Sequence, residues 1–396
     1  MHDWIVPQGY RFAGHVSGLR AEPNRRDLAL IVSDRPSAAA GVFTQNRVAA
    51  APVQVCRERL PRADARGVVV CSGNANACTG SQGLADARRM TVLAANAIGC
   101  QPEQFLVAST GVIGRPLPMP ALEAGIPAAA KNLDNSIAAV DNAAHAILTT
   151  DTFLKVASAK LTLSRAEARL LGFAKGAAMI GPNMATMLAF LMTDAAVHPS
   201  DLQTILRHSV SRTFNCISVE GHTSTNDSVI LFANGQEPPL AGKDLDEFAA
   251  AVHTICAHLA KAIARDAEGA SHLVTIEVEG TRDDAEARQI AKAIAESALV
   301  KCAIFGADPN WGRIVSAAGY AGVSFEEKQL SLWLGDMPIY QHGAPLPFDP
   351  RAASNYLHHN REVMVRLRFT LGSGQCTFYT CDLTPDYIRL NADYTT

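Results

Sequence analysis

The stretch Gly181-Pro182-Asn183-Met184-Ala185-Thr186-Met187-Leu188 decides how the rest of the chain is interpreted. A proline–asparagine turn leads into a small residue, a threonine and an apolar run that ends at Met192, so one hydroxyl stands at the start of a core element. A break between Ala185 and Thr186 would leave Thr186 with a free α-amino group beside its own hydroxyl. Since an α-amino group has a pKa near ~8, it can act as a general base, and an amino-terminal threonine is a known nucleophile. The alternative is an ordinary loop entering a buried element with Thr186 as a cap, which this stretch by itself favours.

Length and composition indicate a globular α/β enzyme. The chain has 396 residues, enough for two domains or for one domain with a large lobe, and 48% of them are hydrophobic. Ala and Gly are abundant, as in proteins that pack helices closely on sheets. The net charge is −3 and no Lys/Arg block stands out, so the basic surface typical of nucleic-acid-binding proteins is not expected.

The cysteines and the amino-terminal sequence indicate a cytoplasmic protein. Nine cysteines are scattered along the chain without a CxxC pair, which fits a reducing compartment. Four of them lie in or beside apolar runs and are expected in the core: Cys56, Cys71, Cys78 and Cys216. The start lacks a basic segment followed by an apolar one, and no apolar run reaches about 18 residues, so we expect neither a signal peptide nor a membrane span.

The 12 histidines predict no metal site. They include no HExxH motif and no close Cys/His cluster. Two pairs are expected at the surface or at helix caps, namely His253/His258 and His358/His359.

Two aliphatic runs each end in a tight loop of polar residues and glycine. A strand predicted over 67–71 runs into Ser72-Gly73-Asn74-Ala75-Asn76, and one predicted over 105–109 ends in Thr110-Gly111-Val112-Ile113-Gly114. Such loops are a common way to place backbone N–H groups in a site. Another buried strand is predicted over 28–33.

The remaining pattern alternates helices and strands. The strongest helix signal covers 243–265, with Gly269 after its end. Further helices are predicted over 85–97, 119–131, 135–148, 200–213 and 283–299, and strands over 214–219, 228–233 and 272–279. Residues 154–175 carry charged and apolar residues in mixed order. The last hundred residues look β-rich, and the polar tail 391–396 would ordinarily be frayed.

Seven motifs occur in colinear order over essentially the whole chain. They are Ser72-Gly-Asn-Ala-Asn-Ala-Cys-Thr-Gly80, Ser109-Thr-Gly-Val-Ile-Gly114, Thr149-Thr-Asp-Thr152, Lys175-Gly176 with Pro182-Asn-Met-Ala-Thr-Met-Leu188, Thr223-Ser-Thr-Asn-Asp227, Gly306-Ala-Asp-Pro-Asn-Trp-Gly-Arg313 and Asn391-Ala-Asp-Tyr-Thr-Thr396. Together they closely resemble the ornithine acetyltransferase (glutamate N-acetyltransferase) family of the cyclic arginine pathway.

This resemblance implies a precursor that cuts itself between Ala185 and Thr186. The products would be an α chain of 1–185 and a β chain of 186–396 that fold together, with Thr186 as the nucleophile. Thr110 and Gly111 would form the oxyanion hole. Substrate contacts would fall on Thr152, Lys175, Thr186, Glu268, Asn391 and Thr396. The run 149–152 holds three threonines, so it offers three candidates for the contact given to Thr152. The resemblance also places the polar tail 391–396 in the active site instead of leaving it frayed.

The implied fold is α/β, a layered helix/sheet sandwich of the self-cleaving amino-terminal-threonine acyltransferase type with two lobes. The implied activity is ping-pong transfer of acetyl from N2-acetyl-L-ornithine to L-glutamate through an acetyl-Thr186 ester. The resemblance implies an α2β2 heterotetramer, and we expect no cofactor. From the charge and the apolar runs described above, we expect binding to neither nucleic acid nor membrane. Some family members also use acetyl-CoA as a co-substrate. No residue decides this here, and the bifunctional form is our working expectation.

Two other functions stay open. A related amino-terminal-threonine aminopeptidase or amidohydrolase would pass its acyl group to water, and an uncut, inactive paralogue would act by binding. The chain also departs from the family pattern twice. It has Gly176-Ala177-Ala178-Met179 where Gly-Ser/Ala-Gly-Met is usual, and Glu220-Gly221-His222 where Asp-Gly-Asp is common. The second departure bears on substrate preference or pH dependence.

Overall fold

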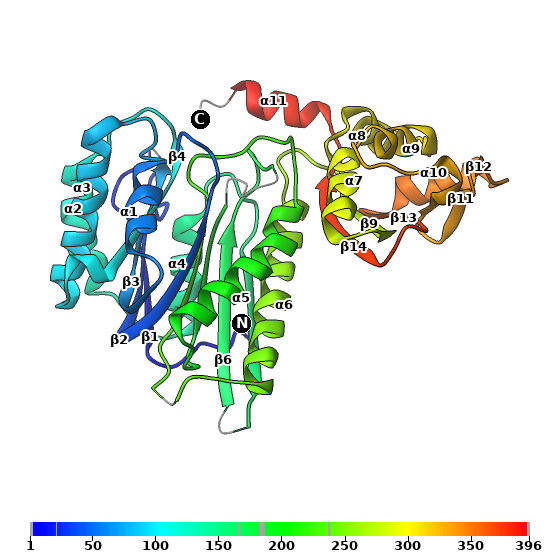
Figure 1. Cartoon of the computed structure of the whole chain (residues 1–396). Coiled ribbons are helices and arrows are strands. Elements are labelled where there is room, and N and C mark those ends of the chain that lie inside the picture. Colours follow the sequence, from blue (N-terminus) through cyan, green and yellow to red (C-terminus); the bar gives the residue numbers. More distant parts are fainter. Residues whose placement is uncertain (1–2, 21, 165–166, 182–186, 237, 394–396) are drawn as a thin grey trace.

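The larger lobe is built on an eight-stranded sheet. The computed structural model describes residues 3–20, 22–164, 167–181, 187–236 and 238–393, and it has two lobes (Figure 1). In the first sheet the strand order is β4-β3-β2-β8-β7-β6-β5, with β1 paired to β2. The strands are β1 Tyr10–His15, β2 Leu28–Phe43, β3 Arg62–Asn74, β4 Phe105–Val112, β5 Lys155–Thr162, β6 Glu167–Lys175, β7 Leu188–Thr193 and β8 Ser228–Ala233. All residues of β7 and β8 are buried, because both faces of the sheet are covered.

Helices cover the two faces of this sheet with separate cores. One core takes Phe173 and Phe190 from the sheet and packs against α1 Ala51–Arg59, α2 Gly80–Ile98, α3 Met119–Ala130 and α4 Ile137–Ile147. The other takes the alternate residues Ala189 and Leu191 and packs against α5 Pro199–Arg212 and α6 Lys243–Arg265. The alternation follows from the two-residue period of a strand.

The smaller lobe is a six-stranded sheet with its own core. Its strand order is β12-β11-β10-β13-β9-β14. The strands are β9 Leu273–Thr281, β10 Ser331–Leu334, β11 Met337–Gln341, β12 Ala344–Pro345, β13 Glu362–Arg368 and β14 Gly374–Cys381, and the helices are α7 Asp284–Glu296, α8 Ala298–Phe305, α9 Trp311–Gly319 and α10 Pro350–His359. After β14, helix α11 (Pro385–Asp393) returns over the end of the first sheet (Figure 1). Three short 3-10 helices complete the described elements: η1 Pro102–Gln104, η2 Phe214–Cys216 and η3 Glu327–Gln329.

The α/β sandwich in two lobes confirms the predicted fold class, and most predicted elements are present. The helix over 243–265 has the predicted bounds. The mixed segment 154–175 forms the antiparallel pair β5–β6. Among the helices of the described ranges, none is long and apolar enough to cross a membrane.

Four predictions were wrong in detail. The segment 214–219 is no strand, because it forms η2 and then makes only an isolated pairing of Ile217 with Tyr379. The helix predicted over 283–299 is two helices, because the Ser297 side chain caps a new one by accepting a hydrogen bond from the Val300 N–H. The β-rich last hundred residues also hold four helices: α8, α9, α10 and α11. Cys78 is exposed rather than in the core, since it follows the buried alanines in a surface loop.

The predicted division at 185/186 does not coincide with the boundary between the lobes. It falls between β6 and β7, which pair with each other inside the first sheet. The lobes instead separate after α6, where the chain passes into β9. The division into α and β chains stays a prediction.

Candidate active site

One pocket at the end of the first sheet brings together five of the predicted site residues. Its lining includes Thr110, Gly111, Lys175, Glu268 and Asn391. They come from β4, from the end of β6, from the segment after α6 and from α11. Residues far apart in the sequence therefore meet in one cavity.

The two polar-glycine segments predicted as loops begin inside strands, because β3 extends to Asn74 and β4 to Val112. Parallel pairing of β3 with β4 brings these segments together. Ser72 lies opposite Thr110, and Gly73 lies opposite Gly111. Gly111 has φ +132°, and a Cβ on it would lie 2.3 Å from the carbonyl carbon of Gly73. Only glycine fits this close approach, which holds Gly111 in the pocket wall beside the buried Thr110.

Asn226 holds the same two segments in place, a role that the sequence analysis missed. Its Nδ2 donates to the carbonyl oxygens of Ala75, at 2.6 Å, and of Ser109, at 2.8 Å. Asn226 also lines the pocket. The sequence signal that could have found it is an amide side chain in the polar motif 223–227, just before the strand predicted over 228–233.

Asp227 anchors the residue that follows the predicted nucleophile. The Met187 N–H donates to Oδ1 of Asp227 at 3.1 Å, and the Ser228 N–H donates to the Met187 carbonyl at 3.2 Å. Burial raises the pKa of the Asp227 carboxyl well above its ordinary value. The predicted cleavage residues Ala185 and Thr186 themselves lie outside the described residues, as does Thr396.

Lys175 belongs to a buried charge network. It is 2% exposed, and its Nζ lies 4.0 Å from Oδ2 of Asp151. Lys155 joins two carboxylates, with its Nζ 2.7 Å from Oδ1 of Asp151 and 2.5 Å from Oδ2 of Asp266. Burial lowers the pKa of Lys175, and Asp151 opposes this only in part. Burial alone would raise the pKa of Asp151, but Lys175 and Lys155 outweigh it and hold that pKa below the ordinary value.

Thr152 lies beside the pocket rather than in its wall. Its backbone N–H donates to Oδ2 of Asp266 at 3.0 Å, and its hydroxyl also donates to Asp266. It lines an adjoining cavity, which shares Thr149, Thr150 and Glu268 with the pocket. Of the three threonines in the run, Thr149 and Thr150 are thus the two in the pocket wall.

Helix α11 carries Asn391 to the pocket. The Asn391 Nδ2 donates to the Tyr387 carbonyl at 2.9 Å and to Oε2 of Glu268 at 3.3 Å. The Thr384 hydroxyl donates to the Gly269 carbonyl at 2.6 Å, which fixes the start of the helix beside the end of α6. From composition alone, this carboxyl-terminal segment was expected to be frayed.

The two departures from the family pattern lie near the pocket. Ala178 lines it, and the Ala177 carbonyl accepts the Glu268 N–H at 2.9 Å. Glu220 is largely buried, and both of its carboxyl oxygens are closed off from solvent. Burial raises the pKa of Glu220 to about 7. His222 is exposed.

The described residues contain no group of three or more His, Cys, Asp and Glu side chains that could hold a metal ion. Of the histidines considered above, His253 is half-buried in a cleft between the lobes, and burial lowers its pKa. The arrangement is one of hydroxyl, amide and buried charged groups.

Comparison with known proteins finds one family and curated relatives that match almost the whole chain. A model of the ArgJ family matches residues 11–396. Two relatives are named arginine biosynthesis bifunctional protein ArgJ. The one from Thermosynechococcus vestitus is 46% identical, over 98% of this chain and 97% of the relative, and the one from a Synechococcus species is 47% identical, over 99% and 97%. A crystal structure of the protein of the same name from Bacillus halodurans is 40% identical, with a TM-score of 0.49, over 51% of this chain and 96% of that one.

Proposed function

The chain belongs to the ArgJ family, and on this premise we propose that it transfers an acetyl group from N2-acetyl-L-ornithine to L-glutamate. The observation that carries the proposal is the pocket that joins Thr110 and Gly111 with Lys175, Glu268 and Asn391. Oxyanion donors, a cation and a carboxylate in one cavity match an acyl transfer between amino acids.

The active form would arise by self-cleavage. Thr186 Oγ attacks the carbonyl carbon of Ala185, the Ala185–Thr186 C–N bond breaks, and the acyl group passes from nitrogen to oxygen. Water then hydrolyses this ester, which leaves a carboxylate on Ala185 and a free α-amino group on Thr186. Asp227 assists by holding the backbone N–H of Met187, the next residue.

In turnover, the α-amino group of Thr186 takes the proton of its own hydroxyl as Oγ attacks the acetyl carbonyl. The Thr110 hydroxyl and the Gly111 N–H donate to the oxyanion, and losing one such donor costs ~10²–10³ in rate. Ornithine departs with the proton, and acetyl-Thr186 remains. The amine of glutamate then attacks the ester, which releases N-acetylglutamate and returns the proton to Oγ.

Charge complementarity accounts for substrate choice. Both amino acids carry an α-carboxylate, which Lys175 would pair with, and ornithine carries a δ-ammonium, which Glu268 would accept. The amide of Asn391 already reaches Glu268 and would help to orient it. Thr152 and Thr396 complete the proposed substrate contacts.

Three further properties belong to the same proposal. The cleaved chains would pair as α2β2, the enzyme would work in the cytoplasm, and acetyl-CoA would serve as a second acetyl donor without any bound cofactor. Support for the second donor is the word "bifunctional" in the names of the relatives.

The test combines cleavage with an acetyl-transfer assay. Purified protein should give two fragments with masses that place the cut before Thr186, and Thr186→Ala should stay uncut. The cleaved protein should form N-acetylglutamate from N2-acetylornithine and glutamate. Release of acetate irrespective of glutamate would instead identify a hydrolase, and an uncut chain without either activity would identify a binding protein.

A further inference from the structure

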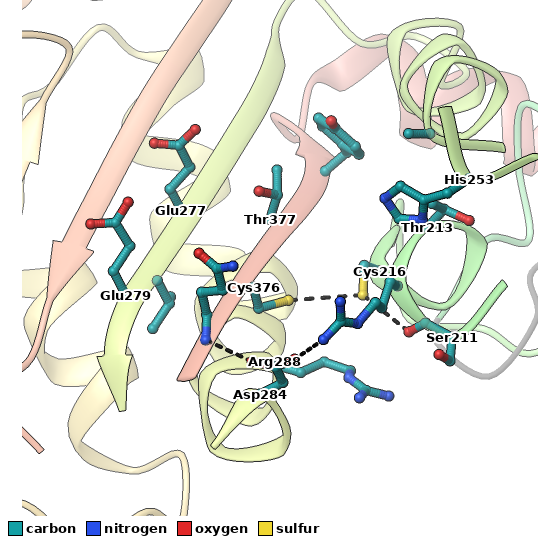
Figure 2. Close-up of a pocket in the computed structure, with 15 residues that line it drawn as sticks. Ser211, Thr213, Cys216, His253, Glu277, Glu279, Asp284, Arg288, Cys376 and Thr377 are labelled. Atoms are coloured by element: carbon teal, nitrogen blue, oxygen red, sulfur yellow. Dashed lines mark hydrogen bonds and ion pairs between the residues drawn. The ribbon is translucent and has the colours of Figure 1, made fainter. Parts of the chain in front are cut away.

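A second cleft lies between the two lobes and holds a pair of cysteines (Figure 2). Cys216 ends η2 in the first lobe, and Cys376 lies on β14 in the second. Their Sγ atoms are 3.8 Å apart, and each of the nine cysteines is a free thiol. The pair lies outside the lining of the pocket that contains Thr110.

We propose that Cys216 and Cys376 form a reversible oxidation site, in which a disulfide joins the two lobes. A disulfide has an S–S length of about 2 Å, so the sulfurs must approach by about 2 Å. The backbones beside them are already held together, because Ile217 pairs with Tyr379 and the Ser218 N–H donates to the Tyr379 carbonyl at 3.0 Å. Side-chain rotation can therefore supply most of the movement.

The surroundings favour a thiolate at Cys216. Arg288 lines the cleft with the two sulfurs (Figure 2). Arg212 also lines the cleft, and it pairs with Asp284. The hydrogen bond from the Cys376 thiol, together with Arg288 and Arg212, lowers the pKa of Cys216. The same hydrogen bond and burial raise the pKa of Cys376. The hydrogen bond that the Cys376 thiol donates, and the two guanidinium groups that line the cleft, make Cys216 the attacking sulfur and Cys376 the resolving one.

Other groups around the cleft do not oppose this assignment. His253 has a lowered pKa through burial and the nearby Arg212, so it adds little positive charge near neutral pH. The carboxylates of Glu277 and Glu279 pair with arginines of β13, at 3.0 Å and 3.2 Å. By contrast, burial raises the pKa of Cys256 to about 12, which keeps that thiol inert.

A small disulfide such as glutathione disulfide would be the oxidant. The Cys216 thiolate attacks one of its sulfurs, the S–S bond breaks, and one glutathione thiolate leaves. Cys376 then loses its proton and attacks Sγ of Cys216, which expels the second glutathione thiolate. The protein dithiol loses two electrons and two protons, and the oxidant gains both.

The crosslink would brace the junction from which α11 leaves for the active site. Strand β14 ends at Cys381, and α11 begins at Pro385. Because both cysteines follow residue 186, cleavage as proposed above would leave them on the same fragment. The oxidation site does not depend on that cleavage.

The test treats the reduced, full protein with glutathione disulfide and maps the peptides without reduction. We expect one pair of peptides, containing Cys216 and Cys376, to be joined by a disulfide. The joined pair should weigh ~2 Da less than the two separate peptides, and dithiothreitol should separate them again. The oxidised protein should also unfold at a higher temperature than the reduced protein, since the crosslink restrains the unfolded chain. Two free thiols, or separate glutathione adducts on both cysteines, would overturn the proposal.

Variants separate the pair from the exposed thiols. Cys376→Ser, at a partly buried position, should trap glutathione on Cys216 and should abolish the rise in unfolding temperature. The matched control Cys302→Ser removes an exposed thiol of the same lobe and should leave the crosslink intact. Loss of the crosslink in the control would also count against the pair. None of these readouts uses acetyl transfer, so failure of the proposed activity would leave the result valid.

Discussion

Gly111 occupies a position that no other residue can take without moving the backbone. Its φ of +132° is strained for any side chain, and a Cβ would press on the backbone of Gly73 and Asn74. The close approach sets the direction of the proposed oxyanion donor. Neighbouring Gly114, with φ +79°, faces open space instead.

Gly111→Ala should therefore lower kcat for acetyl transfer by about 10²-fold or more, because the oxyanion donor is displaced. Gly114→Ala shares the positive φ and lacks the collision, so it should keep most of the activity. Steady-state kinetics of the two purified variants provide the measurement. Equal activity in both would show that the collision is absorbed without loss of function.

Glu220 links the stability of the protein to pH. Its pKa is raised by burial from an ordinary 4.5 to about 7. Between these values the folded protein holds a proton that the unfolded chain has lost, so the free energy of unfolding falls as pH rises through this window. Below pH 4.5 both states are protonated, and this contribution is fully retained.

Glu220→Gln removes the titration and should gain stability relative to the wild type as pH rises from about 5 to 8. The gain should be on the order of 1–3 kcal/mol and should level off above pH 7. Urea unfolding of both proteins at pH 5 and pH 8 measures it. If the free energies of unfolding of Glu220→Gln and the wild type differ by the same amount at pH 5 and pH 8, the raised pKa of Glu220 is contradicted.

At the scale of elements, α11 is held where α6 ends. A Cβ on Gly269 (φ +69°) would lie 2.4 Å from the backbone nitrogen of Tyr387 in α11. At the other end of α6, Gly242 also has a positive φ, of +54°, but a Cβ there would have no neighbour within 4 Å. The two glycines share backbone strain and differ in contact.

Gly269→Ala should push α11 away and raise KM for the acetyl donor by on the order of 10-fold, since Asn391 leaves the pocket. Gly242→Ala should change only stability, by about 1 kcal/mol. Initial-rate kinetics and thermal unfolding of both variants make the comparison. An unchanged KM in Gly269→Ala would mean that α11 does not contribute to substrate binding.

At the scale of the whole molecule, the proposed cleavage would cut within one sheet. Strand β6 pairs with β7 from Leu170↔Thr193 to Lys175↔Leu188, across the 185/186 bond. The cores on both faces combine side chains from before and after this bond, such as Phe173 with Phe190 and Leu170 with Leu191. Separating the fragments would expose both cores.

The cleaved protein should therefore elute as a single species under native conditions, and its fragments should part only in denaturant. Size-exclusion chromatography followed by a denaturing gel of each fraction provides the measurement. Thr186→Ala, uncut, is the control for elution volume. Fragments that elute separately in buffer would contradict a shared sheet.

Local patterns in the sequence determined the long elements and predicted the residues of the site. The spacing of apolar residues predicted α6 to the residue, because a helix with one buried face repeats every 3.6 residues. The motifs predicted Thr110 and Lys175, and the family resemblance added Glu268. All three line one pocket, and their roles in it stay a prediction. Short segments such as 214–219 were wrongly predicted as strands, because an apolar run does not reveal whether a neighbouring strand is present to pair with it.

Only the tertiary structure decided which of these residues meet. Parallel pairing of β3 with β4 places Gly111 against Gly73, and the return of α11 brings Asn391 to Glu268. The support from Asn226 and Asp227, the raised pKa of Glu220 and the facing thiols of Cys216 and Cys376 all depend on contacts between distant segments. A linear sequence fixes the side chains, but burial and approach distances, which set their hydrogen bonds and pKa values, exist only after the chain has packed.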